Sequence, residues 1–247
     1  MKYSKTIMKC RHCNTVLNEK FLDLGSAPPS NAYLENSSVN QSETHFPLTV
    51  YVCQNCWLVQ TQDFAKSDEL FNDDYAYFSS TSKSFLEHAR NYCNDVTKRL
   101  SLSSESHVVE IASNDGYLLK NFVETGIPCL GVEPTASTAE AASNAGVPTL
   151  QEFFGEVLAK QLVSENKSSD LIIGNNVFAH VPDINDFTKG IASLLKPQGT
   201  VTLEFPHLLE LIKHDQFDTV YHEHFSYLSL TAVTSIFEMA GLRIYDV

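Results

Sequence analysis

Long apolar runs and clusters of basic residues are both missing from this 247-residue sequence. No apolar run approaches the roughly 18 residues of a membrane span, and the first five residues lead into a cysteine pair instead of the apolar stretch of a signal peptide. The 17 lysine and arginine residues face 30 acidic ones, which gives a formal net charge of -13. Because contacts to nucleic-acid phosphates need clustered positive charge, this composition argues against a DNA or RNA partner. We therefore expect a soluble, cytoplasmic protein with no nucleic-acid or membrane partner.

Cysteine is scarce as well, and four of the six cysteines form two Cys-x-x-Cys pairs. Cys10 pairs with Cys13 and Cys53 with Cys56, so that each tight turn offers two thiolates. Four thiolates complete the closed tetrahedral shell that Zn²⁺ prefers in structural sites, and we predict that these four residues bind a structural zinc ion. A redox or disulfide role is the alternative interpretation. The other two cysteines stand alone, which indicates a reducing compartment.

The first part of the sequence is therefore predicted to be a zinc-binding N-terminal domain over residues 1–66. The 39 residues between Cys13 and Cys53 exceed the usual zinc-ribbon spacing. We place an inserted loop at residues 24–31, which are rich in turn formers, and short strands at residues 48–52 and 57–59. A helical connector is expected over residues 67–105, because apolar residues from Phe85 to Leu100 repeat at helical spacing.

From residue 106 to residue 247, strand and helix patterns alternate, which predicts an α/β fold with a doubly wound, Rossmann-like parallel sheet. Strands are expected at residues 108–111, 129–133, 147–150, 170–174 and 200–205. Helices are expected at residues 117–125, 136–145, 156–165, 184–196 and 230–240. Glycine or proline follows most of these helices, as a stop signal would. We expect a sixth strand to start at residues 241–247.

The turn after the first of these strands indicates a cofactor site. A dinucleotide site favours Gly-x-Gly-x-x-Gly, which lets the backbone approach a pyrophosphate. Here Glu110 is followed by Ala112, Asn114 and Gly116, so NAD is disfavoured. The spacing instead resembles the first motif of S-adenosylmethionine (SAM) methyltransferases, with alanine and asparagine replacing two glycines. Asparagine tolerates the left-handed backbone conformation better than most residues, which makes the departure mild.

Three further polar residues are expected to border that cofactor. Glu133 ends the second strand, where a carboxylate can accept hydrogen bonds from both ribose hydroxyls; a strand-end acid in water is the alternative. Asn175 and Asn176 follow the fourth strand and would border the methionine or adenine end. Ligands of such sheets bind beyond the carboxyl ends of the strands, which is where all three residues fall.

Side chains able to move protons are concentrated near residue 222. Four of the nine histidines lie between residues 207 and 224, among them His222 and His224, with Tyr221 and Glu223 interleaved. A His-x-His pair also occurs as a metal-binding pair or as two surface residues, and the residues alone leave these alternatives open. The spacing of one residue fits a strand or loop and lacks the helical i, i+4 arrangement of zinc proteases.

Together these motifs resemble the sugar C-methyltransferases that act on nucleotide-linked 4-keto-deoxysugars. The matching pieces are the two cysteine pairs and residues 28–33, 74–80, 110–116, 174–183, 204–207 and 221–228. The resemblance implies a class I SAM methyltransferase core preceded by a small four-cysteine zinc domain, with SAM and structural Zn²⁺ as cofactors. The family's seventh strand and its C-terminal domain are expected to be absent from this sequence.

The resemblance also implies a nucleotide-sugar substrate and a mechanism. A base removes a proton beside the ketone, and the resulting enolate attacks the methyl group of SAM. His224 would be the base, because a neutral imidazole has a pKa near working pH. Glu223 would bind a sugar hydroxyl or orient the histidine. Tyr221, Tyr75 and His180 would donate hydrogen bonds to the ketone oxygen.

Two other functions compete with this one. An O- or N-methyltransferase acting on a small metabolite would use the same cofactor site. A non-catalytic module would bind SAM, a nucleotide sugar or a protein partner without turnover, since fold does not fix function. In the mechanism that the resemblance implies, the alternative for His222 is to face away from the site as a packing or capping residue.

Overall fold

A computed structural model describes residues 7–30, 33–62 and 78–247 of the chain. The chain divides into two compact units that interleave along the sequence. The first, here called the cysteine unit, comprises Met1–Leu70, Phe178–Asn185 and Phe205–Val247, and the second, the parallel-sheet unit, comprises Phe71–Val177 and Asp186–Glu204. Within the described ranges, no helix combines the length and the apolar character that crossing a membrane requires.

The parallel-sheet unit is built on five parallel strands in the order β6-β5-β4-β7-β8. These strands are β4 (Val108–Ile111), β5 (Cys129–Val132), β6 (Thr149–Leu150), β7 (Ser169–Asn175) and β8 (Leu195–Glu204). Their positions confirm the predicted doubly wound sheet. The strand order reverses beside β4, and sheets of this kind bind ligands at the carboxyl ends of the strands near that reversal.

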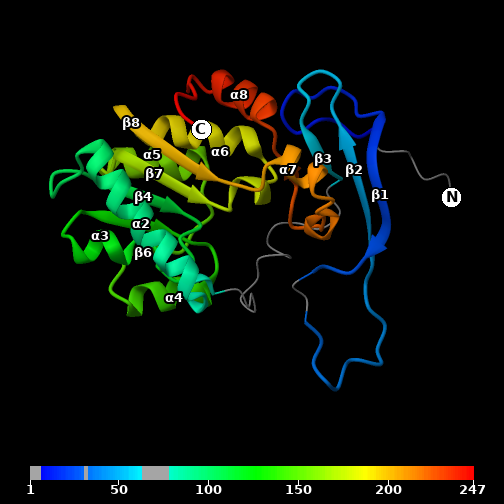
Figure 1. The fold of residues 1–247 in the computed structure, drawn as a ribbon, viewed down its shortest axis with the longest axis horizontal. Coiled ribbons are helices and arrows are strands. Elements are labelled where there is room, and N and C mark those ends of the chain that lie inside the picture. Colours follow the sequence, from blue (N-terminus) through cyan, green and yellow to red (C-terminus); the bar gives the residue numbers. More distant parts are fainter. Residues whose placement is uncertain (1–6, 31–32, 63–77) are drawn as a thin grey trace. The chain divides into compact units, whose positions relative to one another are not determined.

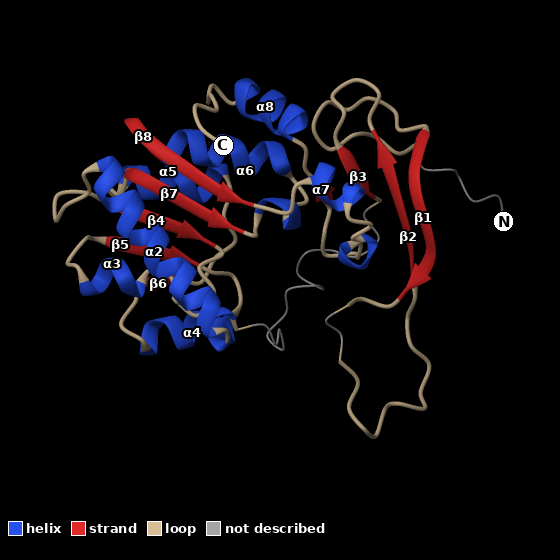
Figure 2. Ribbon diagram, in the orientation of Figure 1, coloured by secondary structure: helices blue, strands red, loops and turns tan. Residues whose placement is uncertain are grey.

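Helices cover both faces of this sheet (Figures 1 and 2). They are α2 (Lys83–Leu100), α3 (Lys120–Glu124), α4 (Ala136–Asn144), α5 (Glu156–Ser164) and α6 (Ile184–Leu194). One core cluster joins Cys93 of α2 and Phe122 of α3 to Val108 and Ile173 of the strands. Alternate residues such as Ile172 point to the other face, because side chains along a strand alternate in direction.

Helix α2 begins at a serine cap and ends at a left-handed residue. The Ser82 hydroxyl accepts a hydrogen bond from the Phe85 N–H at its beginning. At its end Ser101 adopts a left-handed conformation with φ 53°. The expected helical repeat from residue 85 to residue 100 is thereby confirmed.

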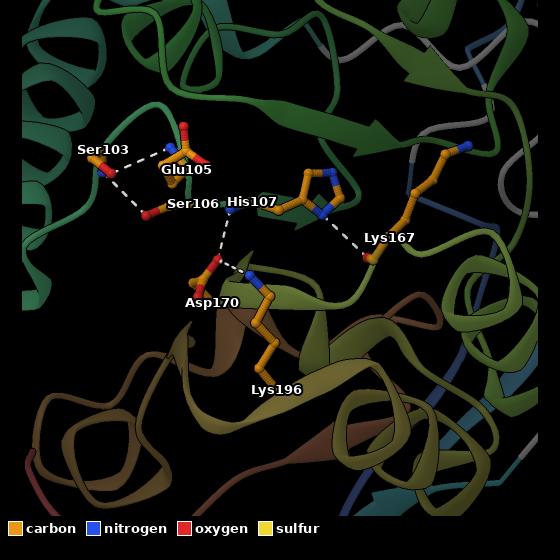
Figure 3. Close-up of polar contacts among 7 residues, drawn as sticks. All are labelled: Ser103, Glu105, Ser106, His107, Lys167, Asp170 and Lys196. Atoms are coloured by element: carbon orange, nitrogen blue, oxygen red, sulfur yellow. Dashed lines mark hydrogen bonds and ion pairs between the residues drawn. The ribbon is translucent and has the colours of Figure 1, made fainter.

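A polar network ties the amino ends of three parallel strands together (Figure 3). The Asp170 carboxylate accepts hydrogen bonds from the His107 N–H at 2.7 Å and from Lys196 Nζ at 2.6 Å. Desolvation raises the pKa of Asp170, but the ion pair with Lys196 and the His107 N–H outweigh it, so the net pKa is lowered. The turn at residues 110–116, here called the cofactor turn, lies at the carboxyl end of β4. The polar network therefore stabilises the sheet from its opposite end.

The cysteine unit contains a four-stranded antiparallel sheet in the order β1-β2-β3-β9. Its strands are β1 (Glu19–Ala27), β2 (Phe46–Val52), β3 (Val59–Thr61) and β9 (Ser226–Tyr227). The expected loop at residues 24–31 is wrong in its first half. Strand β1 continues to Ala27 because pairing with β2 supplies backbone partners, and Gly25, at φ 76°, lies in an irregular part of the register.

Strand β9 brings the histidine-rich segment into the cysteine unit. Tyr227 pairs with Val59, and Ser226 pairs with Gln60 of β3. The unit also contains η2 (Phe178–His180), α7 (Leu208–Lys213), η3 (Phe217–Thr219) and α8 (Leu230–Met239). The sequence did not predict this strand pairing.

The expected sixth strand at residues 241–247 is wrong. Gly241, at φ 79°, ends α8, and the Leu242 N–H donates to the Phe237 carbonyl. Residues 242–247 then continue without strand structure. An alternating pattern forms a strand only beside a partner, and here the Arg243 guanidinium instead lies 5.8 Å from the centre of the Tyr245 ring.

Candidate functional site

The four predicted metal ligands lie together in the cysteine unit. Every pair of sulfur atoms among Cys10, Cys13, Cys53 and Cys56 is within 4.8 Å. The Sγ atoms of Cys10 and Cys56 are 3.5 Å apart, as are those of Cys13 and Cys53. A tetrahedral zinc ion with bonds of about 2.3 Å requires sulfur atoms roughly 3.8 Å apart. The donor set and its spacing therefore fit a closed structural zinc site.

The two cysteine pairs adopt the same local structure. Asn14 and Trp57, the residues directly after each pair, have φ values of 60° and 63°. Their N–H groups donate to the carbonyls of Cys10 and Cys53, each at 2.9 Å. The left-handed residue turns the chain back sharply, so both thiolates of a pair point to one centre. It also explains why β3 begins at Val59 and not at the expected residue 57.

The cofactor turn in the parallel-sheet unit has left-handed residues at all three expected positions. Ala112, Asn114 and Gly116 have φ values of 56°, 51° and 74°. A Cβ atom on Gly116 would lie 2.9 Å from Val147 Cγ2, so only glycine fits there. Alanine in this conformation stores strain of about 1 kcal/mol or more. The backbone thus bends as a glycine-rich turn would, despite the two substitutions.

Glu133 is buried at the end of β5 and organises this turn. One carboxylate oxygen accepts a hydrogen bond from the Asn114 N–H at 2.9 Å, and the other accepts from the Thr135 N–H at 3.0 Å. Burial argues against the alternative of a strand-end acid in water. Each oxygen retains a second lone pair, which can accept a ribose hydroxyl.

A short helical segment also contacts the cofactor turn. The sequence did not predict this contact. In η1 (Ser79–Thr81) the Ser79 N–H donates to Asn114 Oδ1 at 2.9 Å. The Ser80 N–H donates to Asp115 Oδ2 at 3.1 Å. In the sequence, the family resemblance over residues 74–80 is the signal that points to this segment. Tyr75, predicted to be catalytic, lies outside the described residues.

The two asparagines after β7 differ in their surroundings. Asn175 ends the strand, where it pairs with Glu204 of β8. Asn176 is exposed, with φ 53°, and its side-chain amide donates to Glu204 Oε1 at 3.3 Å. Glu204 also contacts His88 Nε2 at 3.1 Å. Both asparagines lie at the carboxyl end of the sheet, as the sequence predicts.

His224 is buried in the cysteine unit, and its hydrogen bonds fix its tautomer. Nδ1 lies 2.8 Å from the Thr219 carbonyl oxygen, and Nε2 lies 2.9 Å from the Tyr221 hydroxyl. A carbonyl can only accept, so Nδ1 carries the hydrogen and Nε2 accepts from the tyrosine. Desolvation lowers the pKa of His224, although the bond to Thr219 opposes it. The imidazole is therefore neutral, with its basic lone pair on Nε2.

A second imidazole packs against the first. The ring centres of His180 and His224 are 4.6 Å apart in an edge-to-face arrangement. Desolvation and the neighbouring His224 lower the pKa of His180 to about 3. Glu223 is buried and directly precedes His224 in the sequence. Its carboxylate accepts a hydrogen bond from Ser30 Oγ at 3.0 Å. We refer to His180 and His224 as the histidine pair.

His222 has a different orientation. Its Nε2 lies 3.2 Å from the carbonyl oxygens of both Phe46 and Pro47, and its ring makes an edge contact with the Phe46 ring. These contacts attach it to β2 as a packing residue. Of the two histidines in the motif, it is His224 that packs against His180.

Comparison with known proteins identifies the family. A family model described as "Putative zinc binding domain" matches residues 10–71, and a model described as "Methyltransferase domain" matches residues 85–247. The chain belongs to the methyltransferase family. Among curated proteins, the C-methyltransferase NovU of Streptomyces niveus is 36% identical over 98% of this chain. The methyltransferase described here spans only 58% of the length of that relative.

Solved structures agree on the fold. The PH0226 protein of Pyrococcus horikoshii OT3 is 17% identical, with a TM-score of 0.53 over 66% of this chain and 84% of that chain. A SAM dependent methyltransferase from Archaeoglobus fulgidus is 16% identical, with a TM-score of 0.50 over 65% of this chain and 74% of that chain. The predicted fold class is confirmed: a class I SAM methyltransferase core with a four-cysteine N-terminal module.

The parallel-sheet unit of this methyltransferase fits the cofactor that its family implies. Within the described ranges, three buried polar atoms near the cofactor turn have no hydrogen-bond partner: Glu110 Oε2, Ser113 Oγ and Asp115 Oδ1. Desolvation, followed by the charges of Glu133 and Asp115, raises the pKa of Glu110 well above its ordinary value. Buried polar groups without partners are costly, so a polar ligand at this turn would be stabilising.

Proposed function

We propose that this methyltransferase transfers a methyl group from SAM to a ring carbon of a nucleotide-linked 4-keto-deoxysugar, and that the four cysteines hold one structural zinc ion. The similarity to a protein named as a C-methyltransferase supports transfer to carbon. The main structural support is the neutral, buried His224, whose lone pair lies on Nε2. Abstraction of a proton beside a ketone needs such a base, with a pKa near or below working pH.

The cofactor would be held by residues of the cofactor turn. SAM, when bound, supplies an electrophilic methyl group on its sulfonium. Glu133 would accept hydrogen bonds from the ribose hydroxyls, while Glu110, Ala112, Asn114 and Gly116 would form the turn beneath the cofactor. Asn175 and Asn176 would border its methionine or adenine end. All seven assignments are expectations from the sequence.

The base would act as follows. The C–H bond beside the ketone breaks, its proton moves to His224 Nε2, and its electron pair forms the enolate. The Thr219 carbonyl then stabilises the imidazolium through the Nδ1 hydrogen, which lies 2.8 Å away. The enolate carbon would form its bond to the methyl carbon as the bond from that carbon to the SAM sulfur breaks. The bonding pair would stay on sulfur and leave a neutral thioether.

The surrounding side chains would stabilise the enolate oxygen. In the structure Tyr221 donates to His224 Nε2, so the base is released when the hydroxyl turns to the ketone. Together with His180, and with Tyr75 as the sequence predicts, Tyr221 would form the oxyanion hole. Glu223 would bind a sugar hydroxyl or orient His224.

Replacement of His224 tests this assignment. In D₂O without SAM, the enzyme should exchange the hydrogen beside the ketone for deuterium, and His224→Asn should slow this exchange by roughly 100-fold or more. His222→Asn is the matched control, because that histidine packs on β2 and should leave the exchange rate unchanged.

Two results would separate the competing functions, and a third tests the metal site. SAM-dependent methylation without exchange in the wild type would favour an O- or N-methyltransferase. Calorimetry that detects no binding of SAM or of its demethylated product would favour the non-catalytic module. Metal analysis should find about one zinc per chain, lost on Cys10→Ser or Cys53→Ser; zinc retained in these variants would overturn the metal assignment.

A further inference from the structure

Arg11 and His12 lie between the first two cysteines. Within the cysteine unit, they contact residues that neighbour the histidine pair or bond to it. We propose that Arg11 is a positioning residue for the histidine pair, and that the first cysteine turn thereby organises the catalytic base as well as the fold. This inference rests on the proposed function of His224 as that base. It assigns a role in the reaction to a residue outside the histidine pair and outside the four cysteines.

The Arg11 guanidinium connects the two segments from which the histidines project. Nη1 donates to the Pro182 carbonyl at 2.8 Å, and Pro182 follows His180 by two residues. Nη2 donates to the Thr61 carbonyl at 3.1 Å. The guanidinium also lies 5.4 Å from the centre of the Phe225 ring, which is adjacent to His224 in sequence. A rigid, planar fork can serve such separated acceptors at once, whereas a lysine ammonium cannot.

Thr61 continues the connection from the guanidinium to the base. Its N–H donates to the Phe225 carbonyl at 3.1 Å. Its hydroxyl donates to the His224 carbonyl at 3.2 Å. The threonine is buried, so these bonds are shielded from water. A shift of β3 would therefore be transmitted to the backbone of His224.

Gln60 connects the same strand to the metal site. Its side-chain oxygen accepts a hydrogen bond from the Arg11 N–H at 2.9 Å, and its Nε2 donates to Cys10 Sγ at 3.2 Å. Gln60 is 1% exposed. A series of hydrogen bonds thus leads from Cys10 through Gln60 and Arg11 to Thr61, whose hydroxyl bonds to the His224 carbonyl. Residues that hydrogen-bond to metal ligands commonly orient those ligands. Here the same contacts also orient the residues that hold the histidine pair.

His12 provides a second connection from the cysteine turn. Its Nδ1 lies 2.7 Å from Asn185 Oδ1, and the Asn185 amide donates to the His12 carbonyl at 2.8 Å. The same amide lies 3.3 Å from the Arg11 carbonyl. This pair of contacts holds the segment after His180 against the turn without involving the guanidinium. Loss of the Arg11 side chain should consequently disturb the spacing of the histidine pair without detaching the segment.

The test compares Arg11→Met with two other variants. Methionine keeps much of the apolar part of the arginine side chain and removes every side-chain hydrogen-bond donor. Arg11→Lys restores the positive charge. Arg243→Met is the matched control, because Arg243 also stacks on an aromatic ring but lies far along the chain in residues 242–247. Each protein is assayed for zinc content, SAM affinity by calorimetry, deuterium exchange beside the ketone, and the ¹⁵N signals of the imidazoles.

We expect Arg11→Met to retain about one zinc per chain and to bind SAM within twofold of the wild type. Its exchange rate at saturating sugar should fall by roughly 100-fold, as misplacement of a reacting group by about 1 Å can cause. The His224 signals should change from a single Nδ1–H tautomer to a mixture. Arg11→Lys should show an intermediate loss, and Arg243→Met none.

The proposal would be overturned by wild-type exchange and an unchanged His224 tautomer in Arg11→Met. Zinc loss in proportion to the loss of rate would overturn it too, since the arginine would then support only the metal site. If the wild type exchanges no hydrogen while the tautomer still changes in Arg11→Met, the proposed function fails and the positioning role stands.

Discussion

Acidification should destabilise the protein through His180 in particular. Desolvation and the neighbouring His224 lower the pKa of His180 to about 3, whereas an unfolded histidine has a pKa near 6.5. A lowered folded pKa means that the unfolded state binds the proton more tightly. The contribution of His180 to stability is therefore complete above about pH 6.5 and is lost as the pH falls from there toward 3.

The size of the effect follows from these two pKa values. At pH 5 the unfolded histidine is almost fully protonated and the folded one is not, which corresponds to a loss of about 2 kcal/mol relative to pH 7.5. Urea unfolding at the two pH values measures it, with His180→Asn as the reference. Cysteine ligands and the partner His224 also titrate, but their contribution largely cancels in the difference between the two proteins.

The expected result is that the wild type loses about 2 kcal/mol more than His180→Asn between pH 7.5 and pH 5. Equal losses in the two proteins would contradict a buried, neutral His180. They would mean that His180 is solvated in the folded state and does not form a neutral pair with His224.

Three further predictions concern the parallel-sheet unit. Ala112→Gly should stabilise the fold by about 1 kcal/mol in urea unfolding, because Ala112 has φ 56°; a destabilised variant would contradict the strained turn. Glu133→Ala should weaken SAM binding by roughly 10-fold or more in calorimetry, because it removes the acceptor for the ribose hydroxyls and leaves two backbone N–H groups without their partner. Unchanged affinity would show that Glu133 does not bind the ribose. Asp170→Asn should cost about 1 kcal/mol at pH 7, and the difference from the wild type should shrink as the pH falls through the lowered pKa of Asp170; a constant difference would show that the Lys196 ion pair contributes nothing.

Local patterns predicted the parallel-sheet unit well. Helix α2, for example, has its amphipathic repeat, a serine at its beginning and basic residues in its last turn, all within twenty residues of sequence. The cofactor turn was predictable for a similar reason: glycine, or a substitute that tolerates a positive φ, is required at fixed spacing after β4. Such features depend on neighbours in the sequence, so one sequence suffices to find them.

Contacts between distant segments were not predictable. Strand β9 has only two residues, and its pairing with β3 joins parts of the chain more than 160 residues apart. The sequence also could not decide between His222 and His224, because their orientations depend on the carbonyls of Phe46, Pro47 and Thr219. Residues 241–247 have the alternating pattern of a strand, but no strand among the described residues pairs with them.

We propose that the histidine pair creates a carbon nucleophile for a methyl group from SAM. Incubation of the enzyme with SAM carrying a ¹³C-labelled methyl group and a nucleotide-linked 4-keto-deoxysugar tests it most directly. We expect a labelled methyl group bonded to the ring carbon beside the ketone, with transfer abolished in His224→Asn and retained in His222→Asn. A label found on oxygen or nitrogen, or transfer that survives the loss of His224, would contradict it.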